Sequence, residues 1–337
     1  MLNLKINYSY KKLDANLWDN SSSATYFTSS NWHDVVLSFY HGTFLTRRLH
    51  KPVYFQASFD DGSWILGFFF VSKTIKGKTI TFGHLLGPSD YYDLLYSPSI
   101  TNEQFQVLFN QIQLDFKSRT MQFVHLKASS KCYQAIAQLP LVISTPLSCV
   151  AIPLPETYEA YYSSLSKSVR QNIRTAYNRL EKSNLHVQLE IFEKRDYAQI
   201  NWEQLKQLYS SRNDFRKEKK YWKSQLYFWL DYGFQDEKDM FDFETIRKTD
   251  FTLAVLKINQ EIAAYFFGFK IEKNIEINRV VINDDFKFFS PGLLLFNEYI
   301  KKEIPQIEGI DLTVGDEKYK FDLGGKPHII YNLKVSI

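Results

Sequence analysis

The feature that most constrains the fold is a repeat of the same order of expected elements in the two halves of the chain. In the first half, turn residues separate three β-rich runs, and an amphipathic helix and another strand follow, at residues 53–58, 63–72, 79–85, 102–118 and 123–126. The second half gives the same order at residues 251–258, 262–271, 275–282, 291–302 and 310–314. Internal duplication is the economical explanation, so we expect two domains of one fold.

The length of the chain agrees with two domains. A chain of 337 residues exceeds the usual size of one domain, roughly 100 to 200 residues. Prolines 146, 153 and 155 are expected to interrupt regular structure, which places the boundary between residues 1–150 and 151–337. Further helices are expected near Trp32 and over 165–182, and a last strand over 329–335. The pattern predicts a mixed α/β class, with a mostly antiparallel sheet flanked by helices in each domain.

Composition and charge exclude several classes of protein. The chain is 45% hydrophobic and 23% charged, which is typical of a globular protein. A formal net charge of +4 is too small for a dedicated nucleic-acid binder of this length. The N-terminus lacks a secretory signal and the apolar runs are short, so we expect a cytoplasmic protein. Cys132 and Cys149 have no metal-binding spacing, and we expect no metal.

The first segment that could carry chemistry is Ser290-Pro291-Gly292, between an expected strand and an expected helix. Ser290 suits an N-cap and Pro291 suits the first helical position. Gly292 adds no side chain, so an anionic ligand could approach the free N–H groups at the helix start. The alternative is that these residues merely start a helix, as most isolated matches of such a short motif do.

The second segment is the run from Gly315 to Lys320, where an expected strand delivers acids, a phenol and an ammonium group. Acyl transfer needs a proton acceptor for the nucleophile and a proton donor for the leaving thiolate, and these side chains supply both. The alternative is an exposed charged turn, which is common in proteins.

Two further basic segments suggest ligands. Arg170 and Arg174 lie four residues apart beside the apolar face of the expected helix, and they could grip a phosphorylated acceptor. A solvated basic face is an equally good interpretation. The aromatic and basic stretch 212–230 suggests a peripheral membrane contact, with a core segment as the favoured alternative.

The arrangement of these segments resembles one known family. The stretch LAVLKINQEIAAYFFGFKIEKNIEINRVVINDDFKFFSPGLLLFNEYIKK from Leu253 and the stretch IDLTVGDEKYKFDLG from Ile310 are similar to GNAT-like acetyltransferases of the CelD-like family, relatives of the Fem peptidoglycan-bridge transferases. The segment SLSKSVRQNIRTAYNRLEKSN from Ser164 is also similar to a Fem segment, and YFTSSNWHDVV and GPSDYYDLL in the first half are less similar. The resemblance implies two tandem GNAT-like domains.

The resemblance also implies which residues bind a thioester donor. In such folds the pantetheine arm lies along a strand backbone and the pyrophosphate lies at the next turn, which implies donor contacts at Val280, Val281, Ile282, Phe289, Ser290 and Gly292. The sequence departs from the family's usual Gln/Arg-x-x-Gly-x-Gly/Ala loop, since Phe288-Phe289-Ser290-Pro291-Gly292 stands in its place.

Catalytic roles follow from the same resemblance. Tyr319 has the position of the tyrosine that protonates the departing thiolate, and Asp316 or Glu317 would be the general base. Lys320 resembles the lysine that Fem-like enzymes place beside the phosphate of the acceptor, where it would neutralise charge.

The sequence therefore favours an acyltransferase that moves an acyl group, most simply acetyl, from acyl-CoA to an amine or hydroxyl of a sugar-containing cell-envelope or polysaccharide precursor. The acceptor would be a sugar nucleotide or another phosphorylated sugar, and no DNA is expected as a partner. A Fem-like transferase using aminoacyl-tRNA is the main alternative. A non-catalytic scaffold for envelope assembly is the other.

Overall fold

The chain was analysed as a computed structural model, which describes residues 3–12, 18, 25–40, 51–74, 77–83, 89–139, 142–217 and 246–336. It divides into two compact units. Unit 1 comprises Met1–Ser148 and Ile329–Ile337, and unit 2 comprises Cys149–His328. Both units combine a mixed sheet with helices, so the predicted mixed α/β class is confirmed.

Unit 1 is built on a sheet in the order β1-β2-β3-β4-β6-β13, in which β4 and β6 are parallel and the other neighbouring strands are antiparallel. The short strand β5 pairs with β3. The elements of unit 1 before β7 are β1 (Leu4–Ser9), η1 (Tyr26–Thr28), α2 (Ser30–Tyr40), β2 (Pro52–Phe59), β3 (Trp64–Thr74), β4 (Gly77–Phe82), β5 (Leu95–Tyr96), α4 (Asn102–Phe116), β6 (Thr120–Lys127) and α5 (Lys131–Ala137).

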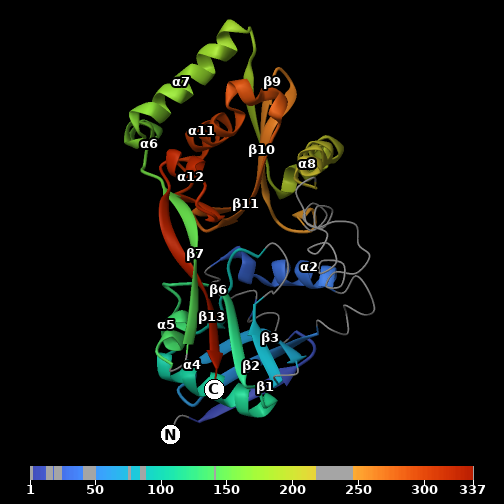
Figure 1. The fold of residues 1–337 in the computed structure, drawn as a ribbon, viewed down its shortest axis with the longest axis vertical. Coiled ribbons are helices and arrows are strands. Elements are labelled where there is room, and N and C mark those ends of the chain that lie inside the picture. Colours follow the sequence, from blue (N-terminus) through green and yellow to red (C-terminus); the bar gives the residue numbers. More distant parts are fainter. Residues whose placement is uncertain are drawn as a thin grey trace. The chain divides into compact units, whose positions relative to one another are not determined.

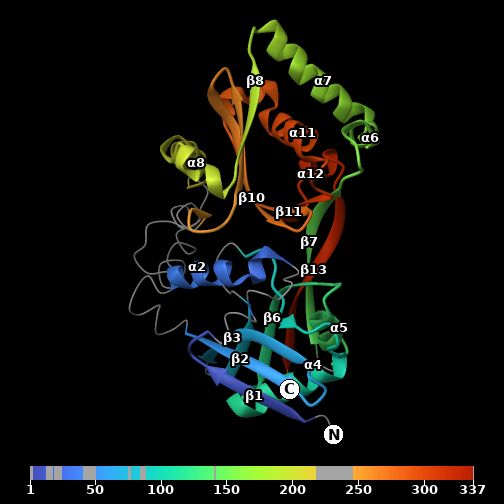
Figure 2. The ribbon, with the colours of Figure 1, turned by 180° about the vertical axis from the view of Figure 1, so that it is seen from behind.

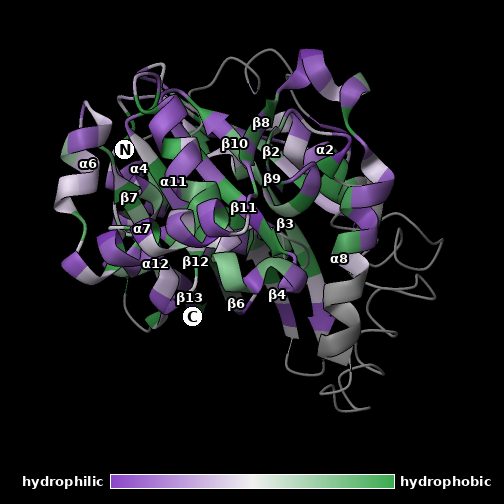
Figure 3. Ribbon diagram, turned by 90° about the horizontal axis from the view of Figure 1, so that it is seen from above, coloured by the Kyte–Doolittle hydropathy of each residue, from purple (hydrophilic) through white to green (hydrophobic). Residues whose placement is uncertain are grey.

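Helix α4 forms as its sequence predicts. Thr101 and Gln104 form a capping box that satisfies the first N–H groups of the helix. The apolar residues at spacings of three and four are buried against the sheet, namely Phe105, Leu108, Phe109 and Ile112. In Figure 3, strand β3 is largely green because its residues are mostly apolar, whereas helices α2 and α11 carry both purple (polar) and green (apolar) residues.

Unit 2 repeats the sheet of unit 1 in the order β8-β9-β10-β11-β12-β7, with β11 and β12 parallel and the other neighbours antiparallel. The elements from β7 to the end of the chain are β7 (Val142–Pro153), α6 (Tyr158–Ser164), α7 (Lys167–Lys182), β8 (Val187–Phe192), η2 (Lys194–Gln199), α8 (Trp202–Lys217), β9 (Thr252–Ile258), β10 (Glu261–Ile271), β11 (Asn274–Ile282), η3 (Asp284–Phe289), α11 (Pro291–Glu303), β12 (Gly309–Val314), α12 (Lys318–Asp322) and β13 (Lys326–Ser336), the last of which lies mostly in unit 1.

The last strand of each repeat completes the sheet of the other unit. Strand β7 follows α5 of unit 1, yet its residues from Cys149 onward pair with β12 of unit 2. Strand β13 follows α12 of unit 2, yet from Ile330 it pairs with β6 of unit 1. Residues 329–337 therefore belong to unit 1, and the expectation that they lie in the second domain is wrong.

The expected interruption by prolines is also wrong. Strand β7 runs through Pro146 and ends at Pro153. Proline is tolerated in a strand wherever its missing N–H is not needed for the ladder, so these residues do not break the element. The residues that pair with β12 begin at Cys149, three positions after Pro146.

Helices cover both faces of the sheet in unit 2. In Figures 1 and 2, α7 and α11 lie on one side of β10 and α8 lies on the other. Helix α7 buries Val169, Ile173, Ala176 and Leu180, the apolar face predicted from spacing. It starts at Lys167, two residues later than expected, because Leu165 is extended and the Ser166 side chain accepts a hydrogen bond from the N–H of Val169.

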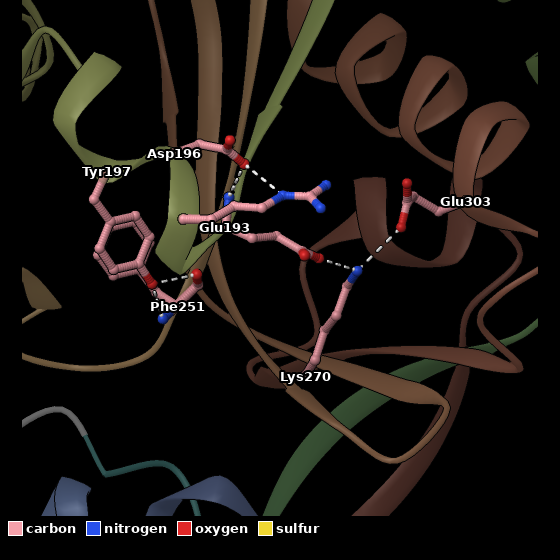
Figure 4. A network of polar contacts seen from close by, with 7 residues as sticks. Glu193, Asp196, Tyr197, Phe251, Lys270 and Glu303 are labelled. Atoms are coloured by element: carbon pink, nitrogen blue, oxygen red, sulfur yellow. Dashed lines mark hydrogen bonds and ion pairs between the residues drawn. The ribbon is translucent and has the colours of Figure 1, made fainter.

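A network of polar contacts in unit 2 links the segment around Glu193 to β10 and α11 (Figure 4). Lys270 on β10 lies between Glu193 and Glu303, with Nζ 2.6 Å and 3.1 Å from their carboxylate oxygens. Nearby, the rings of Tyr197 and Phe251 stack with centroids 4.0 Å apart. Glu303 is buried at the end of α11, so Lys270 neutralises a carboxylate that has little contact with water.

Candidate functional site

The site begins where strands β11 and β12 separate. Their parallel pairing covers only Asn274–Glu276 and Gly309–Asp311. Beyond it, Thr313 has a left-handed backbone with φ of 54°. The N–H of Thr313 donates to the Asp311 side chain at 2.8 Å, and its hydroxyl donates to the carbonyl of Ile277 at 3.1 Å. The first bond keeps the Thr313 N–H within its own strand, and the second links β12 to β11 through a side chain, so the backbone ladder between the two strands does not continue here.

A bulge in β11 accompanies the separation. Arg279 pairs with Phe267 and Ile277 pairs with Gly268, so Asn278 is an extra residue in β11. The extra residue places Ile277 and Val280, three positions apart, against the same hydrophobic core. The N-terminal half of β11 is therefore an ordinary ladder strand, whereas its C-terminal half is turned toward the space between the strands.

That space is a cavity of about 850 Å³ within unit 2. Its walls come from β11, β12, α7, α8, η3, α11 and α12. Apolar side chains form much of the lining, including Val169, Ile277, Val280, Ile282, Leu293, Phe296, Leu312 and Val314. The charged side chains are the cations Arg179, Arg279, Lys287 and Lys320 and the acids Glu317 and Asp322. An apolar channel with an excess of positive charge suits an extended ligand that carries anionic groups.

The turn from η3 to α11 forms one end of the cavity. The Asn283 side chain accepts a hydrogen bond from the N–H of Asp285 at 3.0 Å and starts η3. Ser290 then adopts a left-handed conformation with φ of 54°, and its side chain makes no capping bond, contrary to our expectation. Its carbonyl instead accepts from the N–H groups of Leu293 and Leu294, at 3.0 Å and 3.2 Å.

Gly292 keeps the backbone of this turn accessible. A Cβ atom at position 292 would lie 2.8 Å from Cδ1 of Ile282. Pro291 has no N–H, and among the described residues the N–H of Gly292 has no acceptor. The turn can therefore present a backbone donor to an anion, as donor binding by Ser290 and Gly292 requires. Ser290 and Gly292 line the cavity together with Val280 and Ile282.

The segment after β12 forms the opposite wall. Gly315 has φ of 113°, and the following residues form the short helix α12 where the sequence suggested a turn. Glu317 and Tyr319 line the cavity, and the side chain of Tyr319 is 42% exposed. Asp316 is exposed but does not line the cavity.

Lys320 is buried, and its ammonium group makes contacts within the chain. It is only 3% exposed, and its Nζ donates to the carbonyls of Val314 and Gly315 at 2.8 Å and 3.3 Å. Its ammonium also lies 3.1 Å from Glu317. This charge stabilises the end of β12 and the start of α12, and Lys320 also lines the cavity, so its contact with a phosphate of the acceptor stays a prediction.

The surroundings of Glu317 shift the pKa of its carboxyl group. Partial burial acts to raise its pKa, but a hydrogen bond from its own backbone N–H and the contact with Lys320 lower the pKa below the usual value. The group is thus a carboxylate at neutral pH. A lowered pKa also makes it a weaker proton acceptor.

Helix α7 presents different residues to the cavity from those expected. Arg170 donates to the carbonyl of Ser163 at 2.7 Å and Arg174 donates to Gln171 at 3.1 Å, and neither lines the cavity. The cavity is instead lined by Asn172, Thr175 and Arg179, which our sequence analysis missed. Their spacing of three and four beside the buried face of the helix is the signal that could have found them.

Two of the expected donor contacts also lie outside the cavity lining. Val281 is fully buried, and it pairs with Tyr265, whose hydroxyl donates to the carbonyl of Leu205 in α8. The side chain of Val281 thus packs on the face of the sheet that α8 covers. Phe289 is half-buried and packs against the core of unit 2. Either residue could still contact a ligand through its backbone.

A family model supports this view of unit 2. Residues 167–321 match the model described as the acetyltransferase (GNAT) domain. The chain is an acyltransferase. This assignment argues against the hypothesis of a non-catalytic scaffold. It also accounts for the cavity, since the match spans α7, β11, α11, β12 and most of α12.

Solved structures share the fold of the acyltransferase along nearly its whole length. FemX is 8% identical and has a TM-score of 0.59, and the match covers 96% of this chain and 95% of FemX. A protein of unknown function from Bacteroides thetaiotaomicron is 14% identical, with a TM-score of 0.55 and the same coverage of 96% and 95%. The likeness therefore extends over both units, and the tandem GNAT-like fold is confirmed.

A third solved structure is the C-terminal domain of a putative lysylphosphatidylglycerol synthetase from Agrobacterium fabrum. It is 13% identical, covers 90% of this chain and 92% of its own, and has a TM-score of 0.51. At such low identities these likenesses show the fold alone. No curated protein matches the chain.

Two further features were considered for the residues that the structure describes, a membrane-spanning helix and a metal site. None of the helices formed by those residues is both long and apolar enough to cross a membrane. Across the same part of the chain, no group of three or more His, Cys, Asp or Glu side chains is arranged to hold a metal ion. The stretch 212–230, on which the suggestion of membrane contact rests, lies mostly outside the described residues.

Proposed function

We propose that the acyltransferase uses acyl-CoA as its donor and binds it between β11 and β12. The separation of these strands into an 850 Å³ cavity is the observation that carries the proposal. The pantetheine arm would contact the backbone of Val280, Val281 and Ile282. The pyrophosphate would lie against the turn formed by Phe289, Ser290 and Gly292.

The geometry supports this donor in two ways. The walls beside β11 are apolar, which suits a largely uncharged pantetheine arm. The N–H of Gly292 lies at the η3–α11 end, which suits a pyrophosphate. The resemblance to CelD-like acetyltransferases makes acetyl the simplest acyl group.

In the proposed reaction, the amine or hydroxyl of the acceptor attacks the thioester carbonyl carbon and the carbon–sulfur bond breaks. Asp316 or Glu317 takes the proton from the nucleophile, directly or through a water molecule. Tyr319 gives its hydroxyl proton to the departing thiolate, and a backbone N–H polarises the carbonyl. The lowered pKa of Glu317 favours transfer through water, with the proton passing on to solvent.

The acceptor is proposed to be a sugar-containing precursor of the cell envelope or of a polysaccharide, such as a sugar nucleotide or another phosphorylated sugar. This part of the proposal rests on the resemblance to CelD-like and Fem proteins. We propose that the reaction takes place in the cytoplasm. Arg170 and Arg174 would contact the phosphate of the acceptor from outside the donor cavity. Peripheral contact with a membrane is compatible with this acceptor.

A second candidate donor is aminoacyl-tRNA. The likeness to FemX over 96% of this chain is the observation that favours it. The same cavity would then receive an aminoacyl ester at the end of an RNA. The acceptor would attack the ester carbonyl, the bond to the ribose oxygen would break, and Tyr319 would protonate that oxygen in place of a thiolate.

Binding separates the two donors. Calorimetry and thermal shift on the full chain with acetyl-CoA should give saturable binding and a raised Tm. Charged aminoacyl-tRNA should then give no transfer. The absence of both signals at millimolar acetyl-CoA would remove the coenzyme A proposal, and transfer from aminoacyl-tRNA would replace it.

A further inference from the structure

A cationic pair stands at one end of the donor cavity, away from the groups proposed for catalysis. Arg179 comes from the last turn of α7 and Lys287 from η3, and both line the cavity. The acids of the cavity, Glu317 and Asp322, come from the segment around α12. The end formed by α7 and η3 is thus cationic, whereas near α12 the charge of Lys320 offsets that of Glu317.

Arg179 is held in place by an aromatic residue. Its Nη1 donates to the carbonyl of Phe288 at 2.6 Å, and its guanidinium carbon lies 4.3 Å from the centre of the Phe288 ring. In the described part of the chain this is the single hydrogen bond made by the guanidinium of Arg179. A guanidinium has five N–H donors, so a planar, preoriented fork remains available to a ligand.

The helix that carries Arg179 is itself fixed to α11. The hydroxyl of Tyr177 accepts from the amide of Asn297 at 3.0 Å and donates to the carboxylate of Glu298. Tyr177 lies two residues before Arg179, so these bonds set the position of the helical turn from which Arg179 extends. The position of the guanidinium relative to the η3–α11 turn is therefore preorganised.

We propose that Arg179 and Lys287 bind the phosphorylated ribose of a nucleotide-bearing thioester, the 3′-phosphate of coenzyme A. This inference rests on the proposed function and names the part of the donor that the cationic end recognises. Phe288 acts as a positioning residue, because its carbonyl and ring orient Arg179. The enzyme would then select coenzyme A over thioesters that lack this phosphate.

Affinities for coenzyme A and dephospho-coenzyme A, measured by calorimetry on the full chain, test the inference. Charge-assisted hydrogen bonds to a phosphate contribute enough that wild type should bind coenzyme A roughly 10-fold to 100-fold more tightly. Arg179→Ala should lower the affinity for coenzyme A toward that for dephospho-coenzyme A, with Lys287 keeping part of the preference, and should leave the affinity for dephospho-coenzyme A unchanged. Arg179→Lys should restore part of the preference.

Lys182→Ala is the matched control, since it removes a cation from the same last turn of α7 that does not line the cavity. It should keep the full preference. Equal affinities of wild type for both ligands, or an unchanged ratio in Arg179→Ala, would overturn the inference while leaving the donor proposal standing. Failure of both ligands to bind wild type would instead overturn the donor proposal and the inference with it.

Discussion

The two units share an opened pair of parallel strands and differ in what fills the opening. In unit 1, β4 and β6 pair in parallel only as far as Phe82 and Phe123, as β11 and β12 of unit 2 pair only at their beginnings. The second strand of each pair then contains a left-handed residue, His125 with φ of 56° and Thr313 with φ of 54°. Both units therefore open one parallel strand pair at the same point of the repeat.

What occupies the opening differs. In unit 1 the segment that starts at Ser89 enters it, and the N–H of Tyr92 donates to the carbonyl of His125 at 3.2 Å. The hydroxyl of Tyr92 donates to the carbonyl of Phe68 at 3.1 Å, and the side chain is 3% exposed. In unit 2 the corresponding space is the cavity. The chain itself thus satisfies the backbone in unit 1, whereas unit 2 leaves room for a ligand.

This contrast shows that the opened strand pair is a property of the repeated scaffold and that the inserted residues decide its use. One unit has become a packed core and the other a candidate donor site. Substitutions at equivalent places should therefore affect stability in unit 1 and turnover or binding in unit 2.

The largest difference is expected for two tyrosines. Tyr319→Phe should lower kcat roughly 100-fold or more, because the departing thiolate loses its proton donor, and should leave KM for acetyl-CoA nearly unchanged. Tyr92→Phe should leave kcat unchanged and lower the free energy of unfolding by about 1 kcal/mol, through loss of the bond to Phe68. Steady-state kinetics and urea unfolding check both. Full turnover in Tyr319→Phe would exclude this residue as the general acid.

A smaller difference is expected for two glycines. Gly292→Ala should weaken binding of acetyl-CoA roughly 10-fold, because the added methyl group meets Ile282 and displaces the turn that carries the proposed backbone donor. Gly83→Ala should destabilise the fold by roughly 1 to 3 kcal/mol, since φ is 101° there and the methyl group would meet Val124 and Tyr92. Calorimetry and unfolding curves separate the two outcomes. Equal donor affinity in Gly292→Ala and wild type would contradict the proposed role of the turn.

Unit 2 also contains a buried charge that its neighbours must neutralise. Lys270→Met should lower the free energy of unfolding by roughly 1 to 3 kcal/mol, because Glu303 would be left buried without its cation. Burial acts to lower the pKa of Lys270, but Glu193 and Glu303 raise it above its usual 10.5, so this stabilisation is present at neutral pH and is lost only at higher pH. Lys273→Met, which breaks an exposed pair with Glu308, should change little.

A pH dependence of stability is expected in unit 1. Burial raises the pKa of Asp93 to about 7 from 3.8, against the hydrogen bonds from Ser130 and from the N–H of Leu94. The folded state keeps a proton that the unfolded chain loses, so this group's contribution to stability falls as pH rises from about 4 to about 7. Asp93→Asn should flatten that part of the curve of unfolding free energy against pH. An unchanged curve would show that the carboxyl titrates normally.

The repeated order of elements was predictable because it depends on local patterns. The spacing of apolar residues identified α4 and the buried face of α7, and turn residues separated β9, β10 and β11. The exchange of β7 and β13 was not predictable, because the sheet that a last strand joins depends on long-range pairing. Strand β8 was missed as well.

The site was predictable in its segments and less so in its side chains. The sequence pointed to the turn at Ser290 and to the run from Gly315, and both reach the cavity. It could not show that Lys320 is buried against carbonyl groups, because a lysine beside charged neighbours has the pattern of a surface residue. It also did not single out Arg179, which lines the cavity, since charge alone does not show which side of a helix faces a cavity.

Hydrogen–deuterium exchange with and without acetyl-CoA tests most directly whether the opening in unit 2, and not that in unit 1, receives the donor. On the full chain, the account predicts slower exchange at residues 277–282 and 286–293 and unchanged exchange at residues 79–83 and 89–94. Slower exchange in the segments of unit 1, with no change around β11 and the η3–α11 turn, would contradict it.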